Sequence, residues 1–273
     1  CWVLNRGIYI DLPLQILSYC FTLFVCCMVC NGELVRLKPA PRHLTSFYLM
    51  ISAGGALGGV FVALVAPHIF HGYWEFHLGL AATAVLVAVV LFRDRTSPLR
   101  AGRPRWAWGL ICLAILGLAA ALHLQARGSL QNAVAVKRNF FGTLKILNDE
   151  AGNPEEHRVV LMHGRIEHGY QFTAADKHYW PTSYFGPSSG AGVAICFHPR
   201  RQDPGLRNLR IGVVGLGTGT LASYGEEGDY LRFYEINPDV VDFCGRFFTY
   251  CKDTAARVDV VLGDARISME REM

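Results

Sequence analysis

The first 124 positions consist of long apolar runs separated by short loops. Each run is close to the roughly 20 residues that an α-helix needs to cross the hydrocarbon core of a bilayer. A helix buried in a soluble protein is rarely apolar on all sides over such a length. The pattern therefore predicts a multi-span α-helical membrane region at 1–124, with helices over residues 12–30, 44–70, 72–92 and 106–124.

Short alternating segments replace the long runs from position 134 onward, and they are typical of β-strands. The strands expected first cover residues 139–147, 158–162 and 165–172, with a turn at 149–154. We expect them to form a small β-sheet within a region that covers residues 125–205. A loop over residues 181–187 follows this sheet.

Three later strands are each followed by a glycine or an acid, and they cover residues 209–214, 230–234 and 257–262. A helix is expected after the glycine turn of the first strand, and another over residues 239–250, opened by Asn237 and Pro238. Alternation of strands and helices predicts a parallel α/β unit. Residues 206–273 are therefore expected to begin an incomplete Rossmann-like domain of the methyltransferase type.

The composition changes at the same place along the chain. Of 26 Lys and Arg and 22 Asp and Glu residues, positions 1–124 hold 9 and 4, which leaves 17 and 18 for positions 125–273. Charged residues make up 18% of the chain, below the quarter that is usual in soluble domains. This deficit excludes a disordered protein or one that coats nucleic acid, and the lipid membrane is the expected partner.

Two patterns in the apolar region have structural explanations. Gly54 and Gly58 have the spacing that lets helix backbones approach closely in lipid. Cys27 and Cys30 have C-x-x-C spacing, but they lie in a continuous apolar run with neither a second pair nor a histidine nearby. We therefore expect packing there and no metal site.

The turns after the later strands carry the candidate chemistry. Gly215, Gly217 and Gly219 would let backbone N–H groups approach a ligand closely. Glu235, at the tip of the second strand, can accept hydrogen bonds from both hydroxyls of a ribose. Asp264, at the tip of the third strand, is placed to meet the amino group of adenine.

Two classes of cofactor are compatible with these glycines. Residues 217–222 read as G-x-G-x-x-A, which fits a dinucleotide. Residues 215–219 read as G-x-G-x-G, a pattern seen with adenosylmethionine-type ligands. The second reading begins where the strand ends, and Asp264 supplies it with a third contact. It therefore favours a sulfonium nucleoside.

Short motifs are spread over most of the length of the chain, namely NGEL at 31–34, PAPRHLT at 39–45, FYL at 47–49, RNFFG at 138–142, HG at 163–164 and at 168–169, Gln171, PTSYFGP at 181–187, VVGLGTGTLA at 213–222, YEINP at 234–238 and GDAR at 263–266. In these motifs the chain resembles the spermidine synthase family, specifically its membrane-fused bacterial branch. The resemblance implies an aminopropyltransferase fold in which decarboxylated adenosylmethionine, or adenosylmethionine itself, is the donor and an amine such as putrescine is the acceptor.

The resemblance also implies roles for individual residues. Glu235 would bind ribose and Asp264 adenine, the glycines at 215–219 would line the nucleoside, Gln171 would lie near the nucleoside and Tyr184 near the substrate. Soluble members commonly have an aspartate where this chain has Thr218. Their catalytic aspartates would follow residue 273, so the catalytic residues are unknown and we expect no aminopropyl transfer by residues 1–273 alone.

Three functions remain open from the sequence. The first is a membrane-bound, polyamine-forming transferase, and the second is a non-catalytic nucleoside-sensing domain that regulates a membrane partner. The third is a methyltransferase with a membrane-associated acceptor. The sequence leaves an oligomer possible.

Two arguments about orientation conflict. The loops at 31–43 and 93–105 are basic, and the positive-inside rule places them in the cytoplasm. With four complete spans, residue 125 onward would then lie outside. Adenosylmethionine is a cytoplasmic metabolite, and on this ground we expect a protein of the cell inner membrane whose second region faces the cytoplasm.

Overall fold

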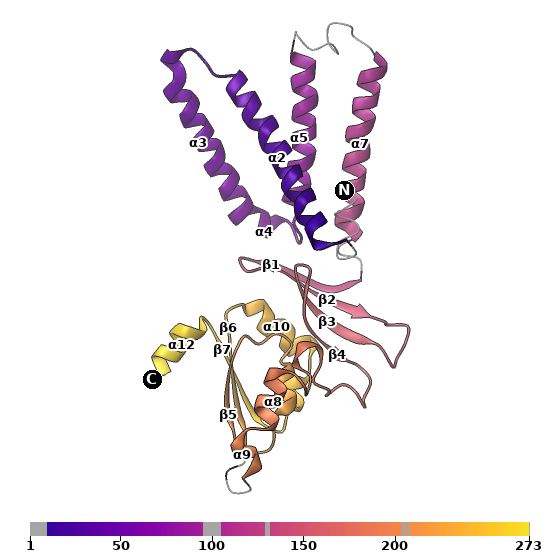
Figure 1. Cartoon of the computed structure of the whole chain (residues 1–273), viewed down its shortest axis with the longest axis vertical. Coiled ribbons are helices and arrows are strands. Elements are labelled where there is room, and N and C mark those ends of the chain that lie inside the picture. The colour runs from indigo at the N-terminus through magenta and orange to yellow at the C-terminus, as the bar shows by residue number, and fades with distance from the viewer. Residues whose placement is uncertain (1–9, 95–104, 129–131, 204–205, 207, 273) are drawn as a thin grey trace. The chain divides into compact units, whose positions relative to one another are not determined.

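The computed structural model describes residues 10–94, 105–128, 132–203, 206 and 208–272. The chain divides into two compact units, Cys1–Gln131 and Asn132–Met273. Each unit is described by itself below, with the element labels of Figure 1.

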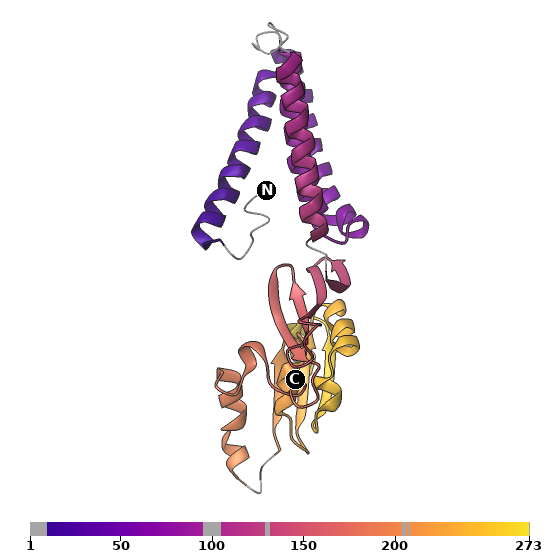
Figure 2. The ribbon, with the colours of Figure 1, turned by 90° about the vertical axis from the view of Figure 1, so that its right-hand side faces the viewer.

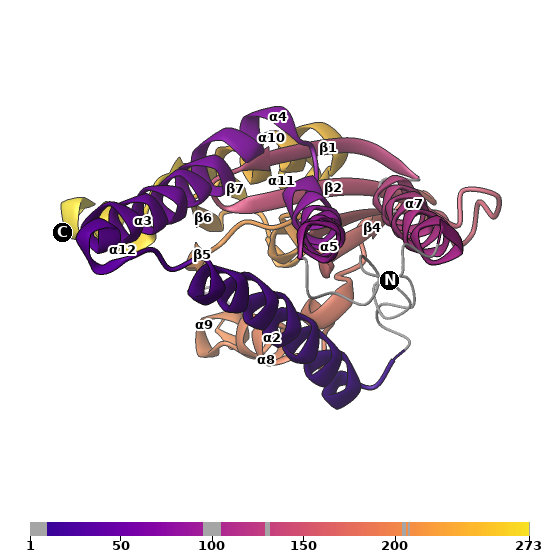
Figure 3. The ribbon, with the colours of Figure 1, turned by 90° about the horizontal axis from the view of Figure 1, so that it is seen from above.

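The first unit contains the long helices α2 (Leu12–Arg36), α5 (Trp74–Arg93) and α7 (Arg105–Gly128). The second apolar run forms η2 (Pro41–His43), α3 (Leu44–Val60), a π-helical turn η3 (Phe61–Val65) and α4 (Ala66–Ile69) in continuous succession. Four helical segments of the described chain are long and apolar enough to cross a membrane, which confirms the helices predicted for the four runs. Viewed from above, α5 and α7 lie side by side and nearly end-on (Figure 3).

Polar contacts connect the ends of these helices. Arg36, at the end of α2, forms an ion pair with Glu33 at 2.9 Å and with Asp94, just after α5, at 2.8 Å. The carboxyl ends of α2 and α5 therefore meet. His77 on α5 also forms a short hydrogen bond with Gln125 on α7.

The second unit begins with a four-stranded antiparallel sheet in the order β1 (Ala133–Asn139), β2 (Gly142–Asp149), β3 (Arg158–His163) and β4 (Ile166–Phe172). The single strand expected over 139–147 is wrong, because the chain reverses within it. Asn139 pairs with Gly142 across a two-residue turn, and the Asn139 side chain accepts a hydrogen bond from the Phe141 N–H. Gly142 has φ 126°, so a glycine and an asparagine override the strand preference of the two phenylalanines between them.

A three-stranded parallel sheet follows, in the order β5 (Arg210–Val214), β6 (Tyr230–Glu235) and β7 (Arg257–Leu262), and it confirms the three later strands. The remaining elements of this unit are helical: η4 (Ser183–Phe185), α8 (Gly190–Cys196), α9 (Pro199–Gln202), η5 (Thr220–Tyr224), α10 (Pro238–Phe247), α11 (Tyr250–Asp253) and α12 (Ala265–Glu272). In Figure 2, α8 and α9 lie on one side of the parallel strands and α10 on the other.

Two helix predictions need correction. The glycine turn leads into the short 3-10 helix η5 instead of an α-helix, and η5 ends just before Gly225, which has extended backbone angles and lies close to a neighbouring segment. A Cβ at Gly225 would lie 2.6 Å from both Ala256 and Thr254. The helix predicted over 239–250 ends at Phe247, since Phe248 has extended backbone angles, φ −122° and ψ 151°.

Both sheets of the second unit contribute to one core. Its fully buried side chains come from β2, β3, β6, α10 and α11, among them Leu144, Ile146, Leu161, Leu231, Phe233, Phe243 and Tyr250. A polar contact adds to this packing, since Lys137 on β1 pairs with Asp239 and Asp242 on α10, each at 3.0 Å. The antiparallel and parallel sheets are therefore held as one body.

Candidate functional site

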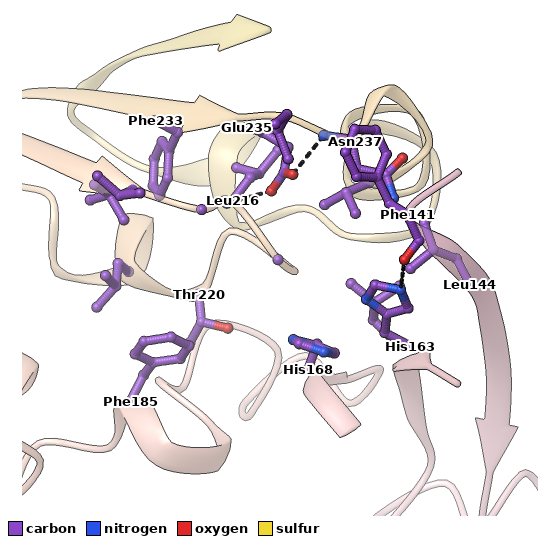
Figure 4. A pocket seen from close by; sticks show the side chains of 18 of the residues that line it. Phe141, Leu144, His163, His168, Phe185, Leu216, Thr220, Phe233, Glu235 and Asn237 are labelled. Carbon is purple, nitrogen blue, oxygen red and sulfur yellow. Dashed lines mark hydrogen bonds between the residues drawn. The ribbon is translucent and has the colours of Figure 1, made fainter. Parts of the chain in front are cut away.

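A pocket of about 570 Å³ opens at the carboxyl ends of β5 and β6. Functional sites in open α/β sheets lie at this end of the strands. Its other walls come from β2, β3, β4, the β1–β2 turn and η4 (Figure 4). The lining is mostly apolar and aromatic, and its polar side chains are His163, His168, Tyr184, Thr220, Glu235 and Asn237.

The glycine turn forms one wall of this pocket. Gly215, Gly217 and Gly219 have φ values of 93°, 57° and 78°, a conformation that side-chain-bearing residues rarely adopt. Gly215 and Gly217 line the pocket, and a Cβ at Gly215 would meet no atom within 4 Å. Gly219 faces away, toward Cys251 and Cys244. Two of the three predicted glycines thus border the pocket directly.

Glu235 lies at the rim of the turn, only 8% exposed. Its two carboxylate oxygens accept hydrogen bonds from the backbone N–H groups of Leu216 and Asn237, both at 2.9 Å (Figure 4). A carboxylate has about four acceptor positions, so these two bonds leave capacity for a ligand. The same group therefore anchors the glycine turn and faces the pocket.

Asn237 is a pocket residue that the sequence analysis treated only as a helix opener. Its side-chain oxygen accepts bonds from Asn139 Nδ2 at 2.6 Å and from the Asp239 N–H at 3.0 Å. Its Nδ2 is buried and has no hydrogen-bond partner among the described residues. A buried donor without a partner is costly.

Two histidines from the antiparallel sheet lie side by side in the pocket lining, with ring centroids 5.5 Å apart. His163 Nε2 lies 2.7 Å from the Phe141 carbonyl oxygen and donates to it (Figure 4). Burial, assisted by the nearby His163, lowers the pKa of His168, although Glu235 acts in the opposite direction. His168 is therefore neutral near pH 7. Neither histidine was assigned a role in the sequence analysis, although the repeated His-Gly pairs marked their positions.

The remaining predicted residues are distributed around and away from the pocket. Tyr184 lines it, and its hydroxyl donates to the His168 carbonyl oxygen at 3.5 Å. Gln171 is not in the lining: its Nε2 donates to the His178 carbonyl at 2.7 Å and to Thr249 Oγ1 at 3.0 Å. Asp264 is also outside the lining and accepts a bond from the Ile267 N–H at 2.9 Å at the start of α12.

Thr218, inside the glycine turn, is 1% exposed. Its hydroxyl shares a hydrogen bond with Thr220 at 2.7 Å. A Cβ at Gly169 would lie 2.7 Å from Thr218 Oγ1. Thr218 therefore packs the glycine turn onto β4.

Metal coordination has no candidate in the described part of the chain. No group of three or more His, Cys, Asp or Glu side chains is close enough there to hold an ion.

The comparisons with known proteins give a distant structural similarity. The sequence matches no family model and no curated protein. Among solved structures it is similar to spermidine synthase from Thermotoga maritima, with 13% identity and a TM-score of 0.36, over 51% of this chain and 44% of that enzyme. The chain thus spans less than half of the enzyme's length. This chain itself has four long apolar helices, an antiparallel sheet and a parallel α/β part.

Proposed function

We propose that the second unit binds an adenosylmethionine-type nucleoside at the carboxyl ends of β5 and β6. The observation that carries this proposal is Glu235 in the pocket lining, whose two carboxylate oxygens each accept one backbone N–H and keep further acceptor positions unused. Each of the two neighbouring hydroxyls of a ribose can donate a hydrogen bond to one of these positions.

The rest of the pocket is compatible with the other parts of such a ligand. The open backbone at Gly215, where a Cβ would meet no atom within 4 Å, permits close approach of the nucleoside. Apolar side chains, including Ile236, Val240 and Leu216, provide a surface suited to adenine. Neutral His168 places no positive charge near a sulfonium centre. Asp264 is proposed for adenine and Gln171 for a contact near the nucleoside, although both lie outside the pocket lining and already make other hydrogen bonds.

The reaction proposed first is aminopropyl transfer from decarboxylated adenosylmethionine to a polyamine such as putrescine, by a protein of the cell inner membrane. An alkylamine with pKa near ~10 is protonated at neutral pH and needs a base before it can attack. Tyr184, at the rim, is the candidate for contact with the acceptor.

Nucleoside sensing without catalysis is the second candidate, and one observation favours it. Glu235 is the single carboxylate in the described lining of the pocket, and it already binds two backbone N–H groups. A sensor needs no base at this position. Methyl transfer to a membrane-associated acceptor is the third candidate. It would use the same pocket at the carboxyl ends of β5 and β6 to bind adenosylmethionine.

Calorimetry on the intact chain tests the proposal, with adenosylmethionine, its decarboxylated form and methylthioadenosine as ligands. Glu235→Ala should weaken binding by about 1–3 kcal/mol, the cost of an unmet buried hydrogen bond. The matched control is Glu270→Ala, since Glu270 is exposed on α12 and pairs only with Arg266 in the described structure. Binding of NADH with no response to the three nucleosides would refute the proposal.

A further inference from the structure

Two cysteines lie directly behind the glycine turn. Cys244 on α10 is 4% exposed, and Cys251 on α11 is partly buried; both are free thiols. A Cβ at Gly219 would lie 2.6 Å from Cys251 Sγ and 3.3 Å from Cys244 Sγ. Because both sulfur atoms fall within reach of one point, they are neighbours in space as well as neighbours of the turn.

The surroundings of the two sulfurs make them chemically unequal. A hydrogen bond from Cys244 lowers the pKa of Cys251, although burial acts against it. The same hydrogen bond, together with burial, raises the pKa of Cys244. Cys251 is thus the thiol that more readily becomes the nucleophilic thiolate, and it is the more exposed of the two.

We propose that Cys244 and Cys251 form an oxidisable dithiol, a modification site that reacts with small disulfides such as glutathione disulfide. The Cys251 thiolate attacks the disulfide, which forms a mixed disulfide and releases one glutathione thiolate. The Cys244 thiol, losing its proton, then attacks the Cys251 sulfur, which forms the intrachain disulfide and releases the second glutathione. Two protein thiols are oxidised and one glutathione disulfide is reduced to two thiols.

Closing this bond affects the pocket through Gly219. A disulfide holds its sulfur atoms about 2.05 Å apart, closer than two thiols in contact, so at least one sulfur must move away from its place against Gly219. Gly219 lies between Gly217 and Thr220, which both line the pocket. Oxidation therefore shifts the turn that would hold the nucleoside. This consequence rests on the proposed function, whereas disulfide formation does not.

The test begins with the intact chain, incubated with an excess of glutathione disulfide. Remaining thiols are alkylated, and digested peptides are analysed by mass spectrometry. The expected product is a peptide pair joined through Cys244 and Cys251. Cys244→Ser should instead keep glutathione on Cys251. Cys196→Ser is the control, because exposed Cys196 lies on α8 outside this pair, and it should leave the disulfide unchanged.

Each outcome decides one of the two claims. If Cys244 and Cys251 stay free, or carry separate glutathione adducts in the intact chain, the dithiol is refuted. The dissociation constant of adenosylmethionine is then measured before and after oxidation, and a change of about fivefold or more is expected from typical coupling between sites. If the disulfide forms but the chain binds no nucleoside before or after oxidation, the result supports the dithiol. The same result contradicts the proposed function.

Discussion

Replacing Glu235 by glutamine removes a charge and one acceptor oxygen at the point where β6 holds the glycine turn. The carboxylate is 8% exposed, and its oxygens accept from the N–H groups of Leu216 and Asn237, each at 2.9 Å. Glutamine has one carbonyl oxygen for these two donors. Its NH₂ group would therefore face an N–H that has nothing to bind.

The expected loss follows from these two bonds. A hydrogen bond to a charged group contributes about 1.5–3 kcal/mol, and a buried donor left without a partner costs about 1–3 kcal/mol. Because one bond survives and the chain can relax around the other, Glu235→Gln should lower the free energy of unfolding of the second unit by about 2–4 kcal/mol. At about 2–4 °C per kcal/mol, the unfolding temperature should fall by roughly 4–16 °C.

A measurement confined to the second unit avoids interference from the apolar helices. Cys244 is 4% exposed in the folded unit, so its alkylation on heating, followed by mass spectrometry, reports unfolding of that unit. Glu270→Gln on the exposed face of α12 is the matched control and should leave the midpoint unchanged. A shift below about 1 °C for Glu235→Gln would show that this carboxylate does not hold the turn.

Three further predictions concern pH and orientation. The pKa of His168 is below its usual 6.5, so acidification through the folded pKa gives His168 a positive charge. This should weaken the binding of cationic adenosylmethionine, measured by calorimetry, but not the binding of uncharged methylthioadenosine. An equal loss for both ligands would contradict the prediction. Burial alone would raise the pKa of Asp229, but hydrogen bonds from backbone N–H groups and from Arg201 lower it below 3.8. The Asp229 carboxylate therefore stabilises the folded unit above the unfolded pKa, and this stabilisation is lost as the pH falls through the folded pKa. Arg201→Ala should therefore move acid unfolding, followed by Trp180 fluorescence, to higher pH, and an unchanged midpoint would refute this. An impermeant maleimide should label exposed Cys196 only after cells are lysed, and labelling of intact cells would place the second unit outside.

Periodicity and strand-end chemistry predicted the elements that depend on local sequence. The apolar runs became long helices, and Glu235 lies at the tip of β6 as expected. Phe140 and Phe141 were assigned to a strand because aromatic residues favour strands, yet they occupy the turn between β1 and β2. Asn139 and Gly142 stabilise this turn, and their effect is recognised only once the pairing of β1 with β2 is known.

Contacts between distant segments account for what the sequence did not reveal. His168 borders the pocket because β4 packs onto the glycine turn, where Gly169 meets Thr218. Gln171 was expected near a ligand, but its amide connects β4 to Thr249 across 78 positions of sequence. Neither the His168 nor the Gln171 contact leaves a periodic signal in the sequence.

The antiparallel sheet has a consequence for the order in which the second unit folds. Each of its strands pairs with the next one along the chain, in the order β1-β2-β3-β4, so every pairing closes a short loop at low entropic cost. The parallel strands β5, β6 and β7 are joined by longer crossovers, which form more slowly. We therefore expect the β1–β4 meander to form first during synthesis and to offer β2 and β3 as a surface on which the later strands and α10 assemble.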